Sequence, residues 1–213
     1  RTMSQKSTAT TAKAFVARSL KRAARAVDVI RPPDPGITIL IYHRVGAPGT
    51  SEMNLDADVF DDQIGWLSAN RRVITLDAAC DELAADGPIA PGVVITFDDG
   101  TADWTDHVLP ILERHSVPAT FYVASGFIDR ELPLSSDGVH ATWEQLRQLA
   151  ASPLVTIGSH TRRHALLRSL TGPDAERELI ECDDRIHQEL GVTSRHFAYP
   201  KAIAGSAAAA DSE

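Results

Sequence analysis

Short apolar runs alternate with amphipathic segments along most of the chain. The runs are rich in β-branched and aromatic residues and lack polar interruptions, which is typical of strands buried on both faces of a parallel sheet. Between them, apolar residues recur every three or four positions, as on one face of a helix. The pattern predicts strands at 37–42, 73–76, 93–97, 119–124, 155–158 and 196–199. It predicts helices at 59–69, 78–85, 104–115, 143–151 and 173–190.

This alternation indicates an α/β fold around a parallel sheet. The periodicity fits a βα barrel and an open doubly wound sheet equally well. Capping residues support several boundaries. Thr142 precedes one predicted helix, with Glu144 or Gln145 near the third position of a capping box, and Asp77 can cap the helix after the second strand.

Residues 1–36 differ from the rest of the chain in charge. Residues 1–31 hold eight Lys or Arg and one acidic residue, a charge of +7, so the remaining residues carry −15 to give the formal total of −8. The segment 12–30 predicts a basic amphipathic helix, and a Pro-rich linker follows it. One interpretation is a solvated helix packed loosely on the domain; the alternative is a helix that binds a membrane surface or a partner. We therefore divide the chain into 1–36 and a main domain at 37–213.

Charge and hydropathy narrow the functional classes. An acidic main domain argues against general nucleic-acid binding. The sequence predicts no transmembrane helix, and no small-residue cleavage site follows an uninterrupted apolar core, so it predicts no signal peptide. The cytoplasm and the cell envelope both stay open as compartments.

Two adjacent carboxylates, Asp98 and Asp99, end a predicted strand and precede Gly100. Because Asp and Gly favour turns, a simple turn is one interpretation. Two carboxylates at the mouth of a buried strand also repel each other, and a bound cation relieves that repulsion. The pair therefore indicates either a turn or a cation site.

A histidine pair follows about sixty residues later, at His160 and His164. The spacing of four places both imidazoles on one face of a helical turn, although such pairs are also common as surface residues. One Asp and two His make a three-ligand set for a divalent metal that leaves positions open for water and substrate. The second Asp is then free to act as a base, which is the equipment of a metal-dependent amide hydrolase.

Three motifs resemble a known family in order and spacing: TFDDG at 96–100, SHTRRH at 159–164 and FAYP at 197–200. They are similar to the polysaccharide deacetylases of the NodB-homology type, carbohydrate esterase family 4. The resemblance covers roughly residues 37–205. The segment ILIYHRV at 39–45 also resembles the first strand of the subgroup that deacetylates exported poly-N-acetylglucosamine.

The resemblance implies a fold and a set of roles. The fold would be a distorted (β/α) barrel with fewer than eight strands. Asp99, His160 and His164 would bind Zn²⁺ or another first-row divalent metal. Asp98 would be the general base that activates the attacking water.

The resemblance also implies a substrate side of the site. Backbone N–H groups near 199–201 would help to hold the oxyanion, so Tyr199 and Lys201 are candidate substrate-binding residues. His43 closes the first strand at the same rim. It is interpreted either as a residue that lines the substrate site or as one that makes a strand-end hydrogen bond.

Two departures from the family pattern stand out. Ala198 occupies the position where many members carry an Arg that pairs with the base, and the role of the neighbouring Arg195 is open. The family's general-acid His belongs to a later motif, and this chain ends at Glu213 before it. We therefore expect the C-terminal part of the barrel, with its proton donor, to lie outside this chain.

Three functional hypotheses follow. The first is a hydrolase that removes N-acetyl groups from a polysaccharide containing GlcNAc, so that its partner is a carbohydrate substrate. The second is an amidohydrolase that acts on a small non-sugar amide. The third is a catalytically incomplete fragment that binds metal.

Overall fold

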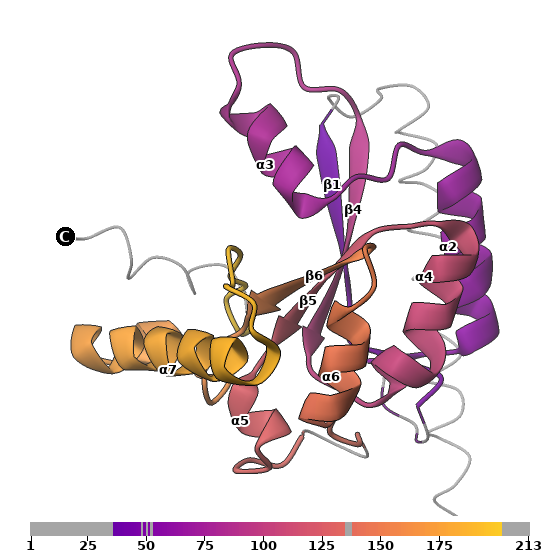
Figure 1. Ribbon diagram of the computed structural model, residues 1–213. Helices are drawn as coiled ribbons and strands as arrows, with labels where there is room; N and C mark the ends of the chain where they lie inside the picture. The colour runs from indigo at the N-terminus through magenta and orange to yellow at the C-terminus, as the bar shows by residue number, and fades with distance from the viewer. Residues whose placement is uncertain (1–35, 48, 50, 52, 135–137, 202–213) are drawn as a thin grey trace, which may run out of the picture. The chain divides into compact units, whose positions relative to one another are not determined.

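A parallel sheet of four strands organises the part of the chain that the structure describes. The computed structural model describes residues 36–201, except 48, 50, 52 and 135–137. The strands lie in the order β1-β4-β5-β6 and are β1 (Ile37–Tyr42), β4 (Gly92–Asp99), β5 (Ala119–Val123) and β6 (Val155–Ser159) (Figure 1). Because every pair is parallel, the carboxyl ends of the strands share one edge, where α/β proteins place their ligand sites.

Helices connect the strands, as the alternation predicts. The longer helices are α2 (Ala57–Asn70), α3 (Leu76–Ala84), α4 (Leu109–His115), α6 (Trp143–Ala150) and α7 (Gly172–Leu190). Shorter elements that the sequence pattern did not predict are the strand pair β2 (Arg44–Val45) and β3 (Asn54–Leu55), the helix α5 (Ser125–Ile128) and a 3-10 turn at Leu167–Ser169.

One face of the sheet carries the main hydrophobic core. Alternate residues of a strand point to the same face, so Phe97 of β4 and Phe121 of β5 lie side by side, with ring centroids 4.8 Å apart. Trp104 packs edge-on against both rings and is fully buried. Helices α2, α4, α6 and α7 cover this face with apolar side chains. Burial of these large aromatic groups is a main source of stability for the sheet.

The opposite face is covered only in part by the described residues. Apolar residues of α3 pack there against Val94 and Tyr122. On the same face, Ile39 and Ile41 of β1 are 51% and 60% exposed within the described part of the chain. The prediction of strands buried on both faces is therefore wrong for β1 as far as the structure describes it. Closure of the sheet into a barrel stays a prediction.

The second predicted strand is reduced to a single parallel bridge from Val73 to Val93. It ends early because α3 begins at Leu76, where the Thr75 hydroxyl accepts a hydrogen bond from the N–H of Ala78 at 3.1 Å. Asp77 was predicted as the cap, and that prediction is wrong. Its side chain lies in the first turn of α3, where a negative charge favours the helix dipole.

The last predicted strand is also a single bridge, between Phe197 and Ser159 of β6. The Ser159 N–H donates to the carbonyl of His196 at 2.9 Å, and the Ala198 N–H donates to the carbonyl of Ser159 at 3.0 Å. This bridge extends the sheet past β6 and brings the third motif to the histidine loop.

The predicted helix at 104–115 begins with a π-helical turn, Trp104–Val108, before α4. The Leu109 N–H donates to the carbonyl of Trp104, five residues earlier. Pro110 explains the wide turn, because it has no N–H to give to the carbonyl of Asp106 and its ring crowds that carbonyl.

Helix α6 starts with a complete capping box. The Thr142 hydroxyl accepts from the Gln145 N–H at 3.2 Å, and the Gln145 Oε1 accepts from the Thr142 N–H at 2.9 Å. Of the two residues proposed for the third position, Gln145 forms the box, and Glu144 instead pairs with Arg147.

We expect Thr142→Ala to lower the free energy of unfolding by about 1 kcal/mol, because the Gln145 N–H in the first turn loses the hydroxyl that accepts its hydrogen bond. Urea unfolding followed by circular dichroism measures the loss. Thr142→Ser keeps the hydroxyl and should remain close to the wild type. An equal loss in both variants would attribute the effect to the threonine methyl group instead of the cap.

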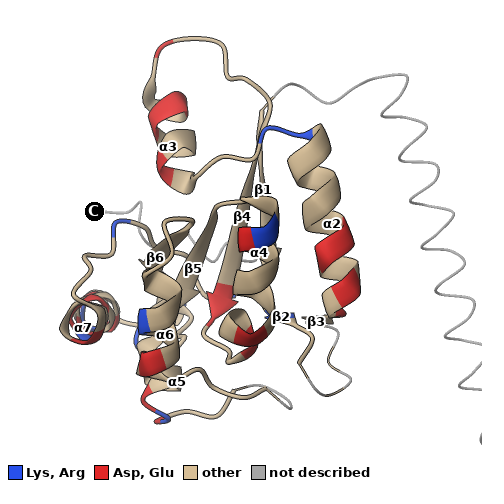
Figure 2. Cartoon of the chain, turned by 45° about the vertical axis from the view of Figure 1, so that its right-hand side comes forward, with Lys and Arg blue, Asp and Glu red and all other residues tan. Residues whose placement is uncertain are grey.

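The predicted N-terminal region 1–36 lies outside the described residues except for Gly36, so the domain division and the basic helix stay predictions. No described helix is both long and apolar enough to cross a membrane. Helices α2 and α3 carry acidic and no basic side chains, in keeping with the acidic character of the main domain (Figure 2).

Candidate active site

The two carboxylates stand at the carboxyl end of the central strand β4. Strand alternation turns Asp98 and Asp99 to opposite faces. The backbone then turns sharply, because Asp99 has φ 86° and Gly100 has φ 109°. Glycine suits this position, because a φ of 109° strains any residue with a side chain, and a Cβ atom would also lie 2.6 Å from Cδ1 of Ile128. A positive φ at a residue other than glycine is uncommon and indicates that Asp99 is held in place by its surroundings.

The histidine pair follows the carboxyl end of β6. His160 comes directly after Ser159, and the loop then curls back through Thr161 at φ 64° to His164 at φ 51°. The spacing of four was interpreted as one face of a helical turn, and that reason is wrong, because the loop is not helical. Left-handed residues bring the rings together instead, with their centroids 4.9 Å apart.

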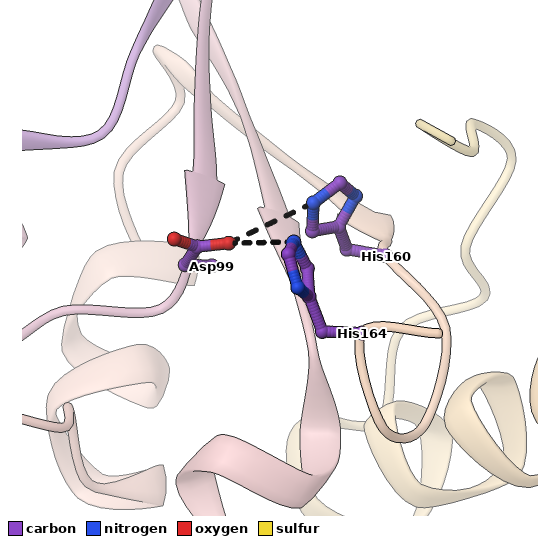
Figure 3. A group of neighbouring side chains, drawn as sticks. All are labelled: Asp99, His160 and His164. Carbon is purple, nitrogen blue, oxygen red and sulfur yellow. Dashed lines mark ion pairs between the residues drawn. The ribbon is translucent and has the colours of Figure 1, made fainter. Parts of the chain in front are cut away.

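The carboxylate and both imidazoles converge on one point (Figure 3). The Nε2 atom of His164 lies 3.2 Å from Oδ1 of Asp99, and the Nε2 atom of His160 lies 3.7 Å from the same oxygen. One ligand atom from each residue lies within 4.8 Å of the others. The structure thus brings together the three residues proposed as metal ligands, and their role as ligands stays a prediction.

The chemistry of this donor set fits a cation. Oδ1 of Asp99 is buried, and no described hydrogen-bond donor reaches it. The Nδ1 atom of His160 lies 2.9 Å from the carbonyl of Ala198, so in the neutral ring Nδ1 donates and Nε2 keeps a lone pair that faces Asp99. A lone pair and a carboxylate oxygen that face each other in a buried site repel unless a positive charge lies between them.

The electrostatic environment favours neutral imidazoles. Burial lowers the pKa of His160, the His164 ring lowers it further, and the Asp99 carboxylate opposes both effects. Burial also lowers the pKa of His164. Neutral imidazoles are the form in which histidine binds metals, so near neutral pH the pair is ready to act as ligands without losing a proton.

Asp98, the candidate base, lies half-buried beside this group. Burial, followed by repulsion from Asp99, raises its pKa from 3.8 to about 7. Its Oδ1 has no hydrogen-bond partner among the described residues. Arg195 does not supply the missing cation, because its guanidinium pairs with Asp77 at 3.1 Å. Ala198 offers no charge, so within the described chain this carboxyl group stays without a cationic partner.

This environment predicts a pH-dependent stability for the metal-free protein. The folded pKa of about 7 lies above the unfolded value, so the folded state holds an extra proton between them. Stability is therefore lost as the pH rises through this window. Asp98→Asn should add about 1–4 kcal/mol to the free energy of unfolding near pH 8 and almost nothing near pH 4.

Urea unfolding in the presence of a chelator measures this difference at both pH values. Asp58→Asn, on the acidic helix α2, is the matched charge control and should show no comparable change. A constant gap between wild type and Asp98→Asn at both pH values would contradict the raised pKa.

Two of the three candidate substrate-binding residues, His43 and Lys201, interact electrostatically with this centre. His43 is half-buried, and its carbonyl accepts from Nε1 of Trp104 at 2.9 Å. Burial lowers the pKa of the His43 ring, and the Asp99 carboxylate raises it. The ring therefore interacts electrostatically with the site. Lys201 is exposed but lowers the pKa of His164. Tyr199 packs edge-on against Phe197 at 4.8 Å between ring centroids.

Sequence reasoning overlooked a charged network behind the histidine loop. Arg162 lies within the loop, and its side chain pairs with Asp129 at 2.6 Å. The position of Arg162 between the two histidines is a signal that could have drawn attention to it. Asp129 had no such signal, because its partners come from distant parts of the chain.

Comparison with known proteins places this geometry in a family. The family model described as "Polysaccharide deacetylase" matches residues 86–211, more than half of the chain. The chain is 28% identical over 141 residues to a poly-beta-1,6-N-acetyl-D-glucosamine N-deacetylase of Escherichia coli strain K12, covering 61% of this chain and 21% of the relative. It is 31% identical over 119 residues to a chitooligosaccharide deacetylase of Sinorhizobium fredii, covering 55% of this chain and 50% of that one.

Solved structures agree on the fold. The structure of IcaB from Ammonifex degensii is similar with a TM-score of 0.67 and 26% identity, over 78% of this chain and 74% of that one. The chain spans between a fifth and about half of the length of the curated relatives described above. The parallel sheet with its motifs at the strand ends, the family match and the structural likeness lead to one conclusion: the chain belongs to the polysaccharide deacetylase family.

Proposed function

We propose that this chain hydrolyses N-acetyl groups of a polysaccharide containing GlcNAc, with the help of a divalent metal. The observation that carries the proposal is the convergence of Asp99, His160 and His164 around a buried carboxylate oxygen to which no described residue donates a hydrogen bond. The names of the relatives from Escherichia coli and Sinorhizobium fredii supply the substrate class.

The three converging residues would hold Zn²⁺ or another first-row divalent metal. When bound, such a metal polarises the carbonyl of an amide and makes a nearby water more acidic. Three protein ligands leave coordination positions open, as in catalytic and unlike structural zinc sites. The Ala198 carbonyl fixes the tautomer and the ring orientation of His160, which is the usual support for a histidine ligand.

Asp98 would remove the proton from the attacking water. A general base works best when its pKa lies near the working pH, and burial and repulsion from Asp99 raise the pKa of Asp98 to about 7. The new C–O bond forms at the acetamide carbon, and negative charge develops on the carbonyl oxygen. Backbone N–H groups near 199–201 would stabilise that charge, a role for which the resemblance of the FAYP motif is the support.

The amine must leave with a proton. The resemblance assigns this proton to a histidine in a later motif of the family. His43 is the candidate within this chain, because its ring shares the field of Asp99 and its pKa is lowered by burial. The products are acetate and a free amino sugar.

Acetate release tests the proposal. We expect the Zn²⁺-loaded protein to release acetate from chitooligosaccharides or poly-N-acetylglucosamine, and a chelator to abolish the release. Small non-sugar acetamides should react more slowly. Turnover of the small amides alone would favour the amidohydrolase. Zinc binding without any acetate release would favour the incomplete metal-binding fragment.

A further inference from the structure

The loop that carries both histidines has a strained backbone. Thr161 and His164 both adopt left-handed φ values, which are unfavourable for residues other than glycine. Such conformations persist only where the surroundings hold them. The contacts of the residues between the histidines therefore decide where the two imidazoles lie.

The backbone of Arg162 is held from two sides. Its carbonyl accepts from the Gly126 N–H of α5 at 2.8 Å, and its N–H donates to the carbonyl of Glu178 in α7 at 2.9 Å. The contact with α5 is so close that a Cβ atom on Gly126 would lie 2.5 Å from the Arg162 carbonyl oxygen. The loop is thus fixed against two helices.

The side chain of Arg162 makes a third attachment. Its Nη1 donates to Oδ2 of Asp129 at 2.6 Å and to the hydroxyl of Ser125 at 3.3 Å, and its Nη2 pairs with Glu131. The side chains of Arg162 and Asp129 are only 12% and 14% exposed. A pair so little exposed is screened weakly by solvent, so its geometry is defined more tightly than that of a surface ion pair.

Asp129 is in turn anchored by groups outside the loop. Its carboxylate accepts from Nε of Arg185 in α7 at 2.9 Å and from Nε1 of Trp143 in α6 at 2.8 Å. Burial alone would raise the pKa of Asp129, but the hydrogen bonds from Arg185, Trp143 and Arg162 outweigh it and hold the pKa below its usual range. The carboxylate stays charged at all ordinary pH values and links α6, α7 and the histidine loop.

We propose that Asp129 is a positioning residue for the metal centre, which acts through Arg162 to set the distance between the imidazoles of His160 and His164. This role rests on the proposed metal site. Asp129 does not touch the converging ligand atoms. Its effect is to keep the strained loop in the one conformation in which both Nε2 atoms face Asp99.

Asp129→Asn tests the role, because it keeps the shape of the side chain and removes the charge that orients Arg162. We expect the Kd for Zn²⁺, measured by competition with a chromophoric chelator, to rise about 10–100-fold, as when a residue that orients a ligand is lost. The visible absorption of the Co²⁺-loaded protein, which reports ligand geometry, should shift. Arg162→Lys replaces the two nitrogen atoms that reach Asp129 and Glu131 by a single one, so it should weaken Zn²⁺ binding in the same direction.

Glu189→Gln is the matched control. Glu189 also pairs with Arg185, at 2.6 Å, but it makes no described contact with Arg162. Its Zn²⁺ affinity and Co²⁺ spectrum should match those of the wild type. If Asp129→Asn does not fold, the Arg162→Lys result decides.

The experiment distinguishes a failure of the proposed metal site from a failure of the positioning role. Wild-type protein that does not bind Zn²⁺ would overturn the metal site itself. Wild-type binding together with unchanged affinity and spectrum in the folded Asp129→Asn variant, or in Arg162→Lys, would overturn only the positioning role. A lower melting temperature without a change in metal binding would mean that the network serves stability alone.

Discussion

Asp99→Asn should weaken Zn²⁺ binding by more than about 100-fold, the upper end of the loss expected when a residue behind the ligands is removed. Oδ1 of Asp99 is the atom that both Nε2 atoms face, and it supplies the negative charge of the donor set. An amide oxygen at the same position carries no net charge. Asparagine is the right replacement, because it tolerates the positive φ of 86° at this residue better than alanine.

The adjacent residue provides the matched control for this prediction. Asp98→Asn removes the same charge one position earlier, and we expect its Kd for Zn²⁺ to stay within about threefold, since a charge outside the coordination sphere contributes little beyond its long-range field. Competition with a chromophoric chelator at fixed pH measures both variants. If binding survives Asp99→Asn and collapses with Asp98→Asn, the ligand and the base are assigned the wrong way round.

The helices that sequence reasoning placed well are those with local signals. Helix α7 carries an apolar stripe and ends at Gly191, whose left-handed φ of 68° matches the signal for a helix end. Helix α6 begins at the Thr142 cap. Strand β1 has the predicted bounds, Ile37–Tyr42, because its apolar run is bounded by Gly36 and His43. Each boundary depends on residues within one or two turns of it.

Features that depend on distant partners were not predictable in this way. Whether β1 is covered on both faces depends on which elements meet it, and Ile39 and Ile41 have the same apolar character in either case. The wide turn before α4 is different, because it depends on Pro110, which lies within the predicted helix itself. A proline inside a helical pattern is a local signal from which the irregular turn could have been predicted.

In the candidate site, too, local sequence signals were predictable and contacts between distant residues were not. Asp98, Asp99, His160 and His164 were found from chemistry and order along the chain, because adjacent carboxylates and paired histidines are unusual at strand ends. The way they meet was not found, because the left-handed residues that curl the histidine loop are not glycines. A sequence pattern gives no reason to expect a threonine and a histidine at positive φ unless the contacts that hold them are known.

The candidate base is also unlike the family pattern in its electrostatics. An Arg at the position of Ala198 would lower the pKa of Asp98, whereas the described chain leaves burial and repulsion from Asp99 to raise it. A carboxyl group without a cationic partner makes a stronger base when ionised. It also costs stability above its pKa, so the arrangement exchanges stability for basicity in the metal-free protein.

Asp98→Asn should therefore reduce acetate release from the Zn²⁺-loaded protein by about 10²–10⁴-fold, the usual effect of losing a general base. The amide cannot accept a proton from the attacking water at neutral pH. Since the Zn²⁺ affinity of this variant is expected to stay close to that of the wild type, the loss should fall on kcat with little change in KM.

Initial rates of acetate release over a range of chitooligosaccharide concentrations, with the occupancy of Zn²⁺ measured in the same samples, separate these quantities. His43→Gln is the companion variant, because His43 is the candidate proton donor within this chain. If Asp98→Asn retains the wild-type kcat at full Zn²⁺ occupancy, Asp98 is not the base. A loss confined to His43→Gln would then move proton transfer to the end of β1.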